Sequence, residues 1–385
     1  GAPAAAFIAD ASTATIATLT VDRTTAIANG SDSVTYTATV LDANSNPVAD
    51  QAITWASSLG TLSAPGGNTG SDGVLTVSLS SLAAGVANLT ATLNGTVTGA
   101  DPVTFTADIS TAVVTVQANT STVPADGATP IIVTATVRDA NNNVLPDLPV
   151  TYTTDFGQLS VPSGTTDANG QVTFNLTSTV AGTASVVAAR LSNGVTGTGG
   201  PYQFVPDLNT AVVTLTPSSN GIYTTDSDNP VAVSVVDAFG NAIVGSVTLA
   251  ADNPAVSITG SPVTLDAGGN GTATVRSATT LAAVALTATL DQNPAKTATA
   301  NISFTTPVTV VSREAVDANG GNANGKTFGQ GPVIAWPGAR FHITLAGGSG
   351  NLSWASNNPA MTVDNDGNVT FNSNPGNGSA LAITI

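Results

Sequence analysis

The chain has 385 residues, of which 42% are hydrophobic, only 4% aromatic and 8% charged, and its formal net charge is −16. Because phosphate binding requires a basic face, this acidity excludes nucleic acid as a partner. The absence of cysteine excludes disulfides and zinc–thiolate sites, and no run of about 18 apolar residues is present that would span a bilayer.

A phenylalanine recurs along the chain at intervals of about 100 residues, at Phe7, Phe105, Phe204 and Phe304. A period of that length matches a whole small domain and is too long for a solenoid repeat. The sequence therefore predicts a tandem array of domains. We assign residues 1–10 to the tail of an upstream repeat and expect four domains after it, at residues 11–108, 109–207, 208–305 and 306–385.

The first recurrent element of each repeat is a strand in which apolar residues alternate with threonine or serine. Residues 34–40 read Val-Thr-Tyr-Thr-Ala-Thr-Val, and residues 131–137 and 231–235 repeat the pattern. A period of two is typical of a strand with one buried face. A turn beginning with aspartate follows each strand, at Asp42, Asp139 and Asp237.

The second recurrent strand carries one large residue at the same place, which we expect to fill a core between two sheets: Trp55, Tyr152, Leu249 and Trp354. A hairpin signal follows each of them, at Asp72-Gly73, Asn169-Gly170, Asn270-Gly271 and Asp366-Gly367. Short strands at this turn spacing predict an all-β chain of tandem immunoglobulin-like β-sandwiches with about seven strands each.

The junctions between repeats contain no Gly/Ser-rich or Pro-rich linker. Residues 105–114 are predicted to run almost directly from one strand into the next. Because such short junctions leave little freedom between neighbours, we expect an elongated, stiff rod. The last unit stops at residues 381–385, which are predicted as a penultimate strand, so we expect it to be incomplete at its C-terminus.

These motifs resemble the bacterial immunoglobulin-like repeats of the intimin and invasin adhesins, which are inverse autotransporters. The likeness to the group-1 type rests on recurring segments, namely Asp42-Ala43-Asn44, Asn46-Pro47-Val48, Ile53-Thr54-Trp55 and Asp72-Gly73 in the first unit and Asp139-Ala140-Asn141, Val150-Thr151-Tyr152 and Asn169-Gly170 in the second. The third unit is a looser match. The fourth unit resembles the group-2 type through residues 354–369.

The resemblance implies a monomeric stalk at the bacterial cell surface, anchored in the outer membrane through a region outside this chain. It also implies contact with a host cell-surface or extracellular-matrix protein, such as collagen, and a role in virulence. The absence of cysteine fits a passenger that crosses the outer membrane unfolded. No binding residue is transferred, since the cysteine-containing, lectin-like end domain of those adhesins is missing here.

Catalytic residues are scarce, because the chain has one histidine, His342, one glutamate and no cysteine. Alternation in residues 340–345 places Phe341, Ile343 and Leu345 inward and His342 toward solvent. We therefore expect no enzymatic activity and no cofactor. Trp336, Arg340 and His342 are candidates for ligand contact, since exposed tryptophan and arginine are typical contact anchors. Burial of Trp336 at a sandwich end is the alternative that the usual environment of tryptophan favours.

Asp364 and Asp366, with Gly367 and Asn368, weakly resemble a Ca²⁺ loop. The later bidentate glutamate of such a loop is missing, so turn hydrogen bonding is the favoured interpretation and no metal is predicted. The recurrence of Asp10, Asp108 and Asp207 at the junctions leaves open whether Ca²⁺ stiffens them.

The sequence thus favours an adhesin stalk that also contributes to host binding through its fourth unit. The first alternative is a purely structural spacer whose binding site lies elsewhere in the full protein. The second is a carbohydrate-binding region of a secreted enzyme, which three tryptophans and four tyrosines over four units disfavour. A catalytic domain is the third.

Overall fold

A computed structural model describes residues 8–316, 322–328, 340–347, 355–356, 359–364, 366–372 and 383–384. These residues form β-strands and three short 3-10 helices, η1 (Ala11–Thr13), η2 (Ile109–Thr111) and η3 (Ser218–Gly221), which confirms the predicted all-β class. None of the helices in this part of the chain is long and apolar enough to cross a membrane. The chain divides into two compact units, Gly1–Val205 and Pro206–Ile385.

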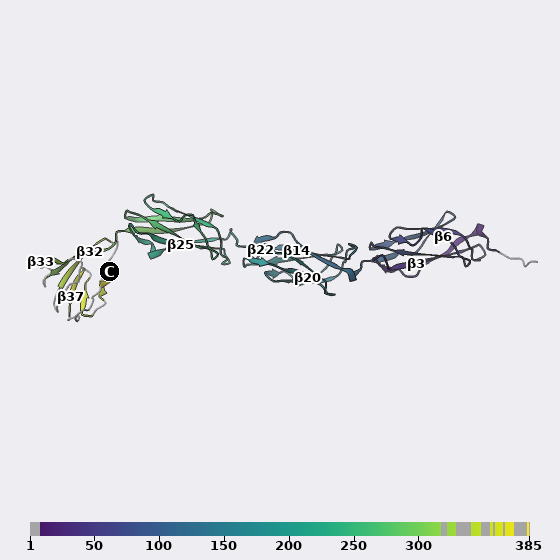
Figure 1. Cartoon of the computed structure of the whole chain (residues 1–385), viewed down its shortest axis with the longest axis horizontal. Coiled ribbons are helices and arrows are strands. Elements are labelled where there is room, and N and C mark those ends of the chain that lie inside the picture. The colour runs from purple at the N-terminus through teal and green to yellow at the C-terminus, as the bar shows by residue number, and fades with distance from the viewer. Residues whose placement is uncertain are drawn as a thin grey trace, which may run out of the picture. The chain divides into compact units, whose positions relative to one another are not determined.

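The first unit begins with sandwich 1, which includes the strands labelled β3 and β6 in Figure 1. Its strands β1 to β11 form three sheets. One sheet has the order β1-β3-β7-β5, and the others have the orders β10-β9-β4-β6 and β2-β11-β8. The strands are β1 (Thr15–Val21), β2 (Thr25–Ile27), β3 (Ser33–Leu41), β4 (Ala52–Ser57), β5 (Thr61–Leu62), β6 (Gly66–Asn68), β7 (Val74–Ser80), β8 (Gly85–Ala87), β9 (Leu89–Leu93), β10 (Thr96–Gly99) and β11 (Val103–Thr106).

Sandwich 2 completes the first unit and repeats this topology with the orders β12-β14-β18-β16, β17-β15-β20-β21 and β13-β22-β19. Its strands are β12 (Val113–Ala118), β13 (Thr122–Pro124), β14 (Ile131–Arg138), β15 (Pro149–Thr154), β16 (Gln158–Leu159), β17 (Ser163–Thr165), β18 (Gln171–Thr177), β19 (Gly182–Ala184), β20 (Val187–Leu191), β21 (Thr196–Gly199) and β22 (Tyr202–Val205).

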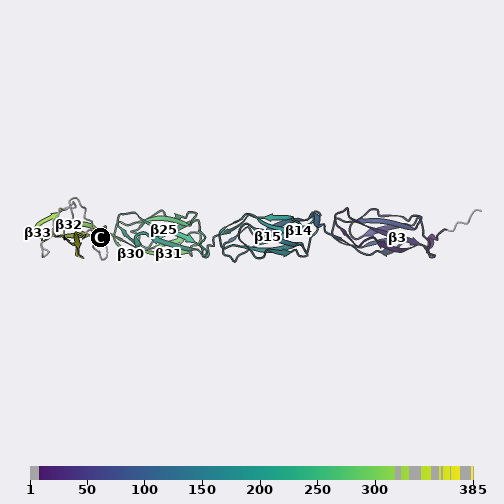
Figure 2. The same cartoon turned by 90° about the horizontal axis from the view of Figure 1, so that it is seen from below.

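The second unit contains sandwich 3, which includes the strands labelled β25, β30 and β31 in Figure 2. One of its sheets has the order β23-β25-β29-β27 and the other the order β24-β31-β30-β26-β28. Its strands are β23 (Val212–Pro217), β24 (Ile222–Thr224), β25 (Asn229–Val236), β26 (Ser246–Ala251), β27 (Ser257–Thr259), β28 (Val263–Thr264), β29 (Asn270–Arg276), β30 (Leu281–Leu290) and β31 (Thr297–Thr305).

The same unit contains a fourth group of strands, which we call module 4. Its described strands form sheets with the orders β33-β32-β34-β37-β36 and β35-β38. The strands are β32 (Thr309–Val316), β33 (Asn322–Phe328), β34 (Arg340–Ala346), β35 (Ala355–Ser356), β36 (Met361–Val363), β37 (Asn368–Phe371) and β38 (Ile383–Thr384).

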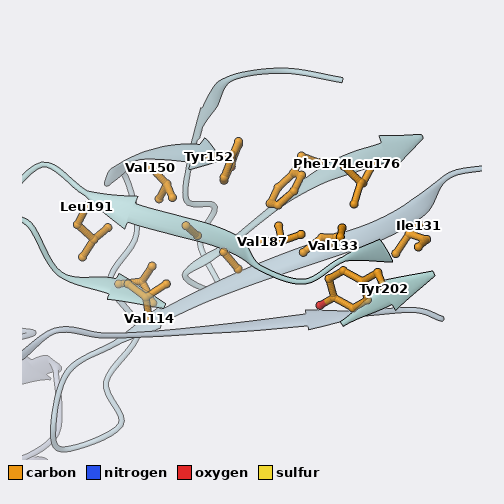
Figure 3. Close-up of a cluster of buried hydrophobic side chains, with 14 of the residues drawn as sticks. Val114, Ile131, Val133, Val150, Tyr152, Phe174, Leu176, Val187, Leu191 and Tyr202 are labelled. Carbon is orange, nitrogen blue, oxygen red and sulfur yellow. The ribbon is translucent and has the colours of Figure 1, made fainter. Parts of the chain in front are cut away.

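The apolar residues that alternate with polar ones along the strands form a buried core between facing sheets. In sandwich 2 the buried cluster includes Val133 of β14 and Phe174 of β18 from one sheet, and Tyr152 of β15 and Val187 of β20 from another (Figure 3). The rings of Tyr152 and Phe174 stack with centroids 4.1 Å apart. The expected core positions Trp55, Tyr152 and Leu249 are buried, as predicted; Trp354 lies outside the described residues.

The periodic phenylalanine has one structural role in all three sandwiches. Phe105, Phe204 and Phe304 are at most 2% exposed and lie in β11, β22 and β31. Each of these strands pairs in parallel with a short early strand, β2, β13 or β24. The phenylalanine therefore closes the sandwich by fixing its last strand beside its beginning. Phe7 lies outside the described residues.

The predicted hairpins are wrong in three of the four units, although the turns exist. The strands on either side of the turn, β6 and β7, β17 and β18, and β28 and β29, belong to different sheets. The turn glycine has a positive φ of 71° at Gly73 and Gly170, which glycine adopts without strain. In sandwich 3 this glycine is Gly269, with φ 75°, because Asn270 and Gly271 already belong to β29. Only the Asp366-Gly367 turn joins a paired hairpin, β36 and β37.

The junction between sandwiches 1 and 2 also differs from the prediction of continuous strands. The 3-10 helix η2 separates β11 from β12. Asp108 caps this helix by accepting a hydrogen bond from the backbone N–H of Ser110 at 2.9 Å, as aspartate does at helix starts. Asp10 caps η1 in the same way, through Ser12 N–H at 3.0 Å.

Candidate functional site

Two of the three predicted ligand-contact residues lie on β34 of module 4. Arg340 is exposed, and His342, two residues along the same strand, is half-buried. His342 does not simply point to solvent as predicted, since its Nδ1 lies 2.9 Å from Oδ1 of Asn368 on the neighbouring β37. Trp336 lies outside the described residues. The structure therefore places Arg340 and His342 on one strand and does not test Trp336.

The weak metal candidates Asp364 and Asp366 lie in the β36–β37 hairpin. Asp364 Oδ1 accepts hydrogen bonds from the backbone N–H groups of Asp366 at 3.0 Å and Asn368 at 2.8 Å, and Oδ2 accepts one from Nδ2 of Asn368 at 3.0 Å. These hydrogen bonds lower the pKa of Asp364, and the bond from the side-chain amide of Asn368 has the largest effect. The carboxylate thus serves the turn, as the favoured interpretation of the sequence expects.

A more elaborate version of this turn occurs in each of the three sandwiches, directly after the end of a central strand. Asp42, Asp139 and Asp237 are at most 6% exposed, and each follows the central strand β3, β14 or β25. Asp139 Oδ1 accepts from the backbone N–H groups of Asn141 and Asn143, at 2.9 and 2.8 Å. Its Oδ2 accepts from Nδ2 of Asn143 at 2.8 Å and from the backbone N–H of Asp108 at 3.0 Å.

The other two sandwiches reproduce these bonds with little change. Asp42 accepts from the backbone of Asp10 and from backbone and side chain of Asn46. Asp237 accepts from the backbone of Asp207 and likewise from Asn241. Each buried carboxylate therefore ties the segment that enters a sandwich to the turn that follows its central strand.

The donors keep these carboxylates ionised. The side-chain amide of Asn46 is the first cause that lowers the pKa of Asp42 to about 2. Burial alone would raise the pKa of Asp139 and Asp237, but the hydrogen bonds from Asn143 and Asn241 and from backbone N–H groups outweigh it, so both pKa values are lowered. This is the behaviour of a carboxylate whose charged form is hydrogen-bonded.

Calcium is expected to leave the sandwiches unaffected. A Ca²⁺ ion needs six to eight oxygen ligands, whereas the junction carboxylates already face N–H donors. We expect the Tm of the chain to stay within about 1 °C when Ca²⁺ or a chelator is added, because only a ligand that binds the folded state raises Tm. Differential scanning calorimetry checks this, and a saturable rise of Tm with Ca²⁺ would contradict it.

Sequence patterns alone assign no hydrogen-bonding role to the asparagine four residues after each of these aspartates, although Asn46 and Asn368 are part of the motifs of the first and fourth units. The pairs are Asp42 and Asn46, Asp139 and Asn143, Asp237 and Asn241, and Asp364 and Asn368. This Asp-x-x-x-Asn recurrence was the available signal. In the first unit the asparagine also reaches the neighbouring sandwich: Asn143 Nδ2 donates to Leu82 O at 2.9 Å, and Ala84 N–H donates to Asn143 Oδ1 at 2.8 Å.

Family models match most of the sequence. The model described as bacterial Ig-like domain (group 1) matches residues 16–106 and 113–205. The model described as invasin, domain 4 matches residues 316–385, the unit for which the sequence motifs predict a group-2 likeness. The matched segments agree with the predicted likeness of the first two units to the group-1 type.

Curated relatives and solved structures agree with these models. The chain is 33% identical to the inverse autotransporter adhesin YeeJ of Escherichia coli (strain K12) over 251 residues, 63% of this chain and 11% of that protein. It is 34% identical to the intimin of Citrobacter freundii over 188 residues, 46% of this chain and 19% of that protein. The chain therefore spans less than a fifth of the length of these relatives. The crystal structure of invasin, a bacterial integrin-binding protein, shares the fold with a TM-score of 0.51 and 22% identity, covering 93% of this chain and 74% of that chain.

Proposed function

Because the chain belongs to the intimin and invasin type of adhesin passengers, which are built from bacterial Ig-like domains, we propose that it is a stiff stalk that contributes to binding of a host-cell or extracellular-matrix protein. It is a segment of a cell-surface adhesin and not an enzyme. What we propose is that the stalk is stiff and that it contributes to host binding.

The buried aspartate at each junction is the observation that carries the proposal. Asp139 binds the backbone of Asp108, which lies between β11 and β12, so the connecting segment is part of the folded structure instead of a free linker. A flexible linker would leave neighbouring domains independent. A stalk whose connections are tied down in this way holds a distal contact surface away from the cell.

Module 4 is the proposed contributor to binding. Arg340 is exposed on β34, and arginine is enriched among residues that dominate binding energies. His342 follows on the same strand, and Trp336 precedes both in sequence. We include in the proposal an outer-membrane anchor in a region outside this chain, a monomeric stalk, and collagen as one target to test.

The experiment compares coated beads on cultured epithelial cells and on collagen layers. Beads carrying the chain are expected to adhere above uncoated beads, and the combined variant Trp336→Ala, Arg340→Ala and His342→Ala is expected to lose most of that adhesion. Thr299→Ala, an exposed change on β31 of sandwich 3, is the matched control and should adhere like the original chain. Adhesion no greater than that of uncoated beads would instead favour a purely structural spacer.

A further inference from the structure

Sandwiches 1 and 2, both in the first unit, are joined by hydrogen bonds that come mainly from one side chain. The amide of Asn143 bonds the loop between β7 and β8 twice, to Leu82 O at 2.9 Å and from Ala84 N–H at 2.8 Å. Asn141 adds one bond from its Nδ2 to Ala28 O at 3.1 Å. The donor and acceptor of the Asn143 amide therefore match an acceptor and a donor two residues apart on the neighbouring sandwich.

The turn of sandwich 2 holds this amide in a fixed orientation. Asp139 Oδ2 lies 2.8 Å from Nδ2 of Asn143, so the amide nitrogen is identified by its contact with a carboxylate, which only accepts. Asp139 Oδ1 bonds the backbone N–H of Asn143 at 2.8 Å. Asn142 between them has a φ of 68°, a conformation that asparagine tolerates. The amide is thus oriented before it meets sandwich 1.

The receiving loop is also held from within its own sandwich. Ser81 Oγ donates to Ala83 O at 2.7 Å and accepts from Ala83 N–H at 3.0 Å. The backbone N–H of Gly30 donates to Ser81 O at 3.0 Å. These bonds fix the loop and leave Leu82 O and Ala84 N–H for Asn143. Two preformed surfaces therefore meet, and little conformational entropy is lost when they do.

Sandwich 1 supplies an internal comparison for this amide. Its turn has the same hydrogen bonds, with Nδ2 of Asn46 3.0 Å from Oδ2 of Asp42 and a φ of 63° at Ser45. The side chain of Asn46 is exposed, and its hydrogen bonds in the structure are those to Asp42 of its own turn. Replacing Asn46 therefore removes the same bonds within a turn without removing a bond between sandwiches.

We propose that Asn143, oriented by Asp139, is the positioning residue that fixes sandwich 2 against sandwich 1 by binding Leu82 and Ala84. The inference deepens the proposed stalk function and rests on it only for its use in the cell. It assigns the stiffness of this joint to one side chain and its preformed loop, in addition to the short connection between the strands.

The test measures the distribution of distances between the two sandwiches by pulsed electron paramagnetic resonance. Because the chain has no cysteine, Thr76→Cys and Thr173→Cys, exposed positions on β7 and β18, give two specific spin-label sites. Asn143→Ala removes two of the three side-chain hydrogen bonds between the sandwiches, each worth a severalfold preference for the docked arrangement. We expect undocked arrangements to become about tenfold more populated and the distribution to broaden.

Two variants and one measurement make the outcome specific. Asn46→Ala should leave the distribution unchanged, and Asn141→Ala should broaden it less than Asn143→Ala. Hydrogen exchange of both sandwiches should stay near that of the parent chain, which separates a loosened joint from unfolding. An unchanged width in Asn143→Ala, or equal broadening in Asn46→Ala, overturns the proposal. If beads carrying the parent chain do not adhere, the host-binding function is wrong, whereas the proposal about this joint is unaffected.

Discussion

Replacing Phe204 by alanine is expected to lower the free energy of unfolding of sandwich 2 by about 3–5 kcal/mol. Phe204 is 2% exposed, its ring centroid lies 6.1 Å from that of Phe156, and its strand β22 pairs with both β13 and β19. Truncation removes a large apolar side chain and leaves a cavity where the last strand closes the fold. Because a domain of this size is stable by about 5–15 kcal/mol, sandwich 2 is expected to lose much of its stability.

Hydrogen exchange measured by mass spectrometry suits this prediction, since it resolves one sandwich at a time within the intact chain. Peptides from β12 to β22 should exchange faster in Phe204→Ala, and those from sandwich 3 should be unchanged. Val186→Ala is the matched control, because Val186 is 47% exposed and lies beside β20. A similar acceleration in both variants would mean that the phenylalanine has no special role in closing the sandwich.

Much of the fold can be predicted from the sequence, because each repeat buries apolar residues at the same positions of its strands. The alternation in residues 34–40 places Val34, Tyr36, Ala38 and Val40 in the core, where all four are fully buried. The large residue at Trp55, Tyr152 and Leu249 lies between the facing sheets for the same reason. Periodicity reports which face of a strand is buried, so these features follow from local patterns.

The connections were harder to predict, because a turn signal does not say which strand will pair with which. Asp72-Gly73 and Asn169-Gly170 have the composition of hairpin turns, yet the strands that follow them cross to another sheet. Their glycines are needed because a Cβ at Gly170 would lie 2.5 Å from Val137 O. The requirement arises from a strand more than thirty residues earlier, so no local pattern reveals it.

The candidate site was predicted only in part for a similar reason. The aspartates at positions 42, 139 and 237 were recognised as turn residues, which they are. The role of their asparagine partners was not predicted, because asparagine is common in turns. In addition, the hydrogen bonds that Asn143 makes with Leu82 and Ala84 join residues about sixty positions apart. The role of Asn143 depends on its contact with the β7–β8 loop of sandwich 1. The local sequence around Asn143 does not reveal that contact and indicates only a turn.

Asp139→Asn is expected to lower the free energy of unfolding of sandwich 2 by about 2 kcal/mol at pH 7, because hydrogen bonds to a charged acceptor are worth about 1.5–3 kcal/mol. The asparagine can still accept the two backbone N–H groups that now bind Oδ1. Its own Nδ2, however, would face the N–H of Asp108 and the amide of Asn143, and donors do not bond donors. The change should also weaken the joint with sandwich 1, since Asn143 loses the carboxylate that orients it.

The effect should depend on pH in one direction. The folded-state pKa of Asp139 is lowered, so its carboxylate contributes stability that is fully present above the unfolded value of about 3.9 and is lost as the pH falls through the folded pKa. The difference between Asp139→Asn and the parent chain should therefore be largest near neutral pH and shrink below about pH 4. Hydrogen exchange in denaturant at several pH values measures this difference in the free energy of unfolding.

Asp147→Asn is the control, because Asp147 is exposed and its φ of 60° suits asparagine equally. A loss of stability in Asp139→Asn that persisted undiminished at pH 2, or that Asp147→Asn matched at pH 7, would show that the charge of Asp139 is not what holds the turn.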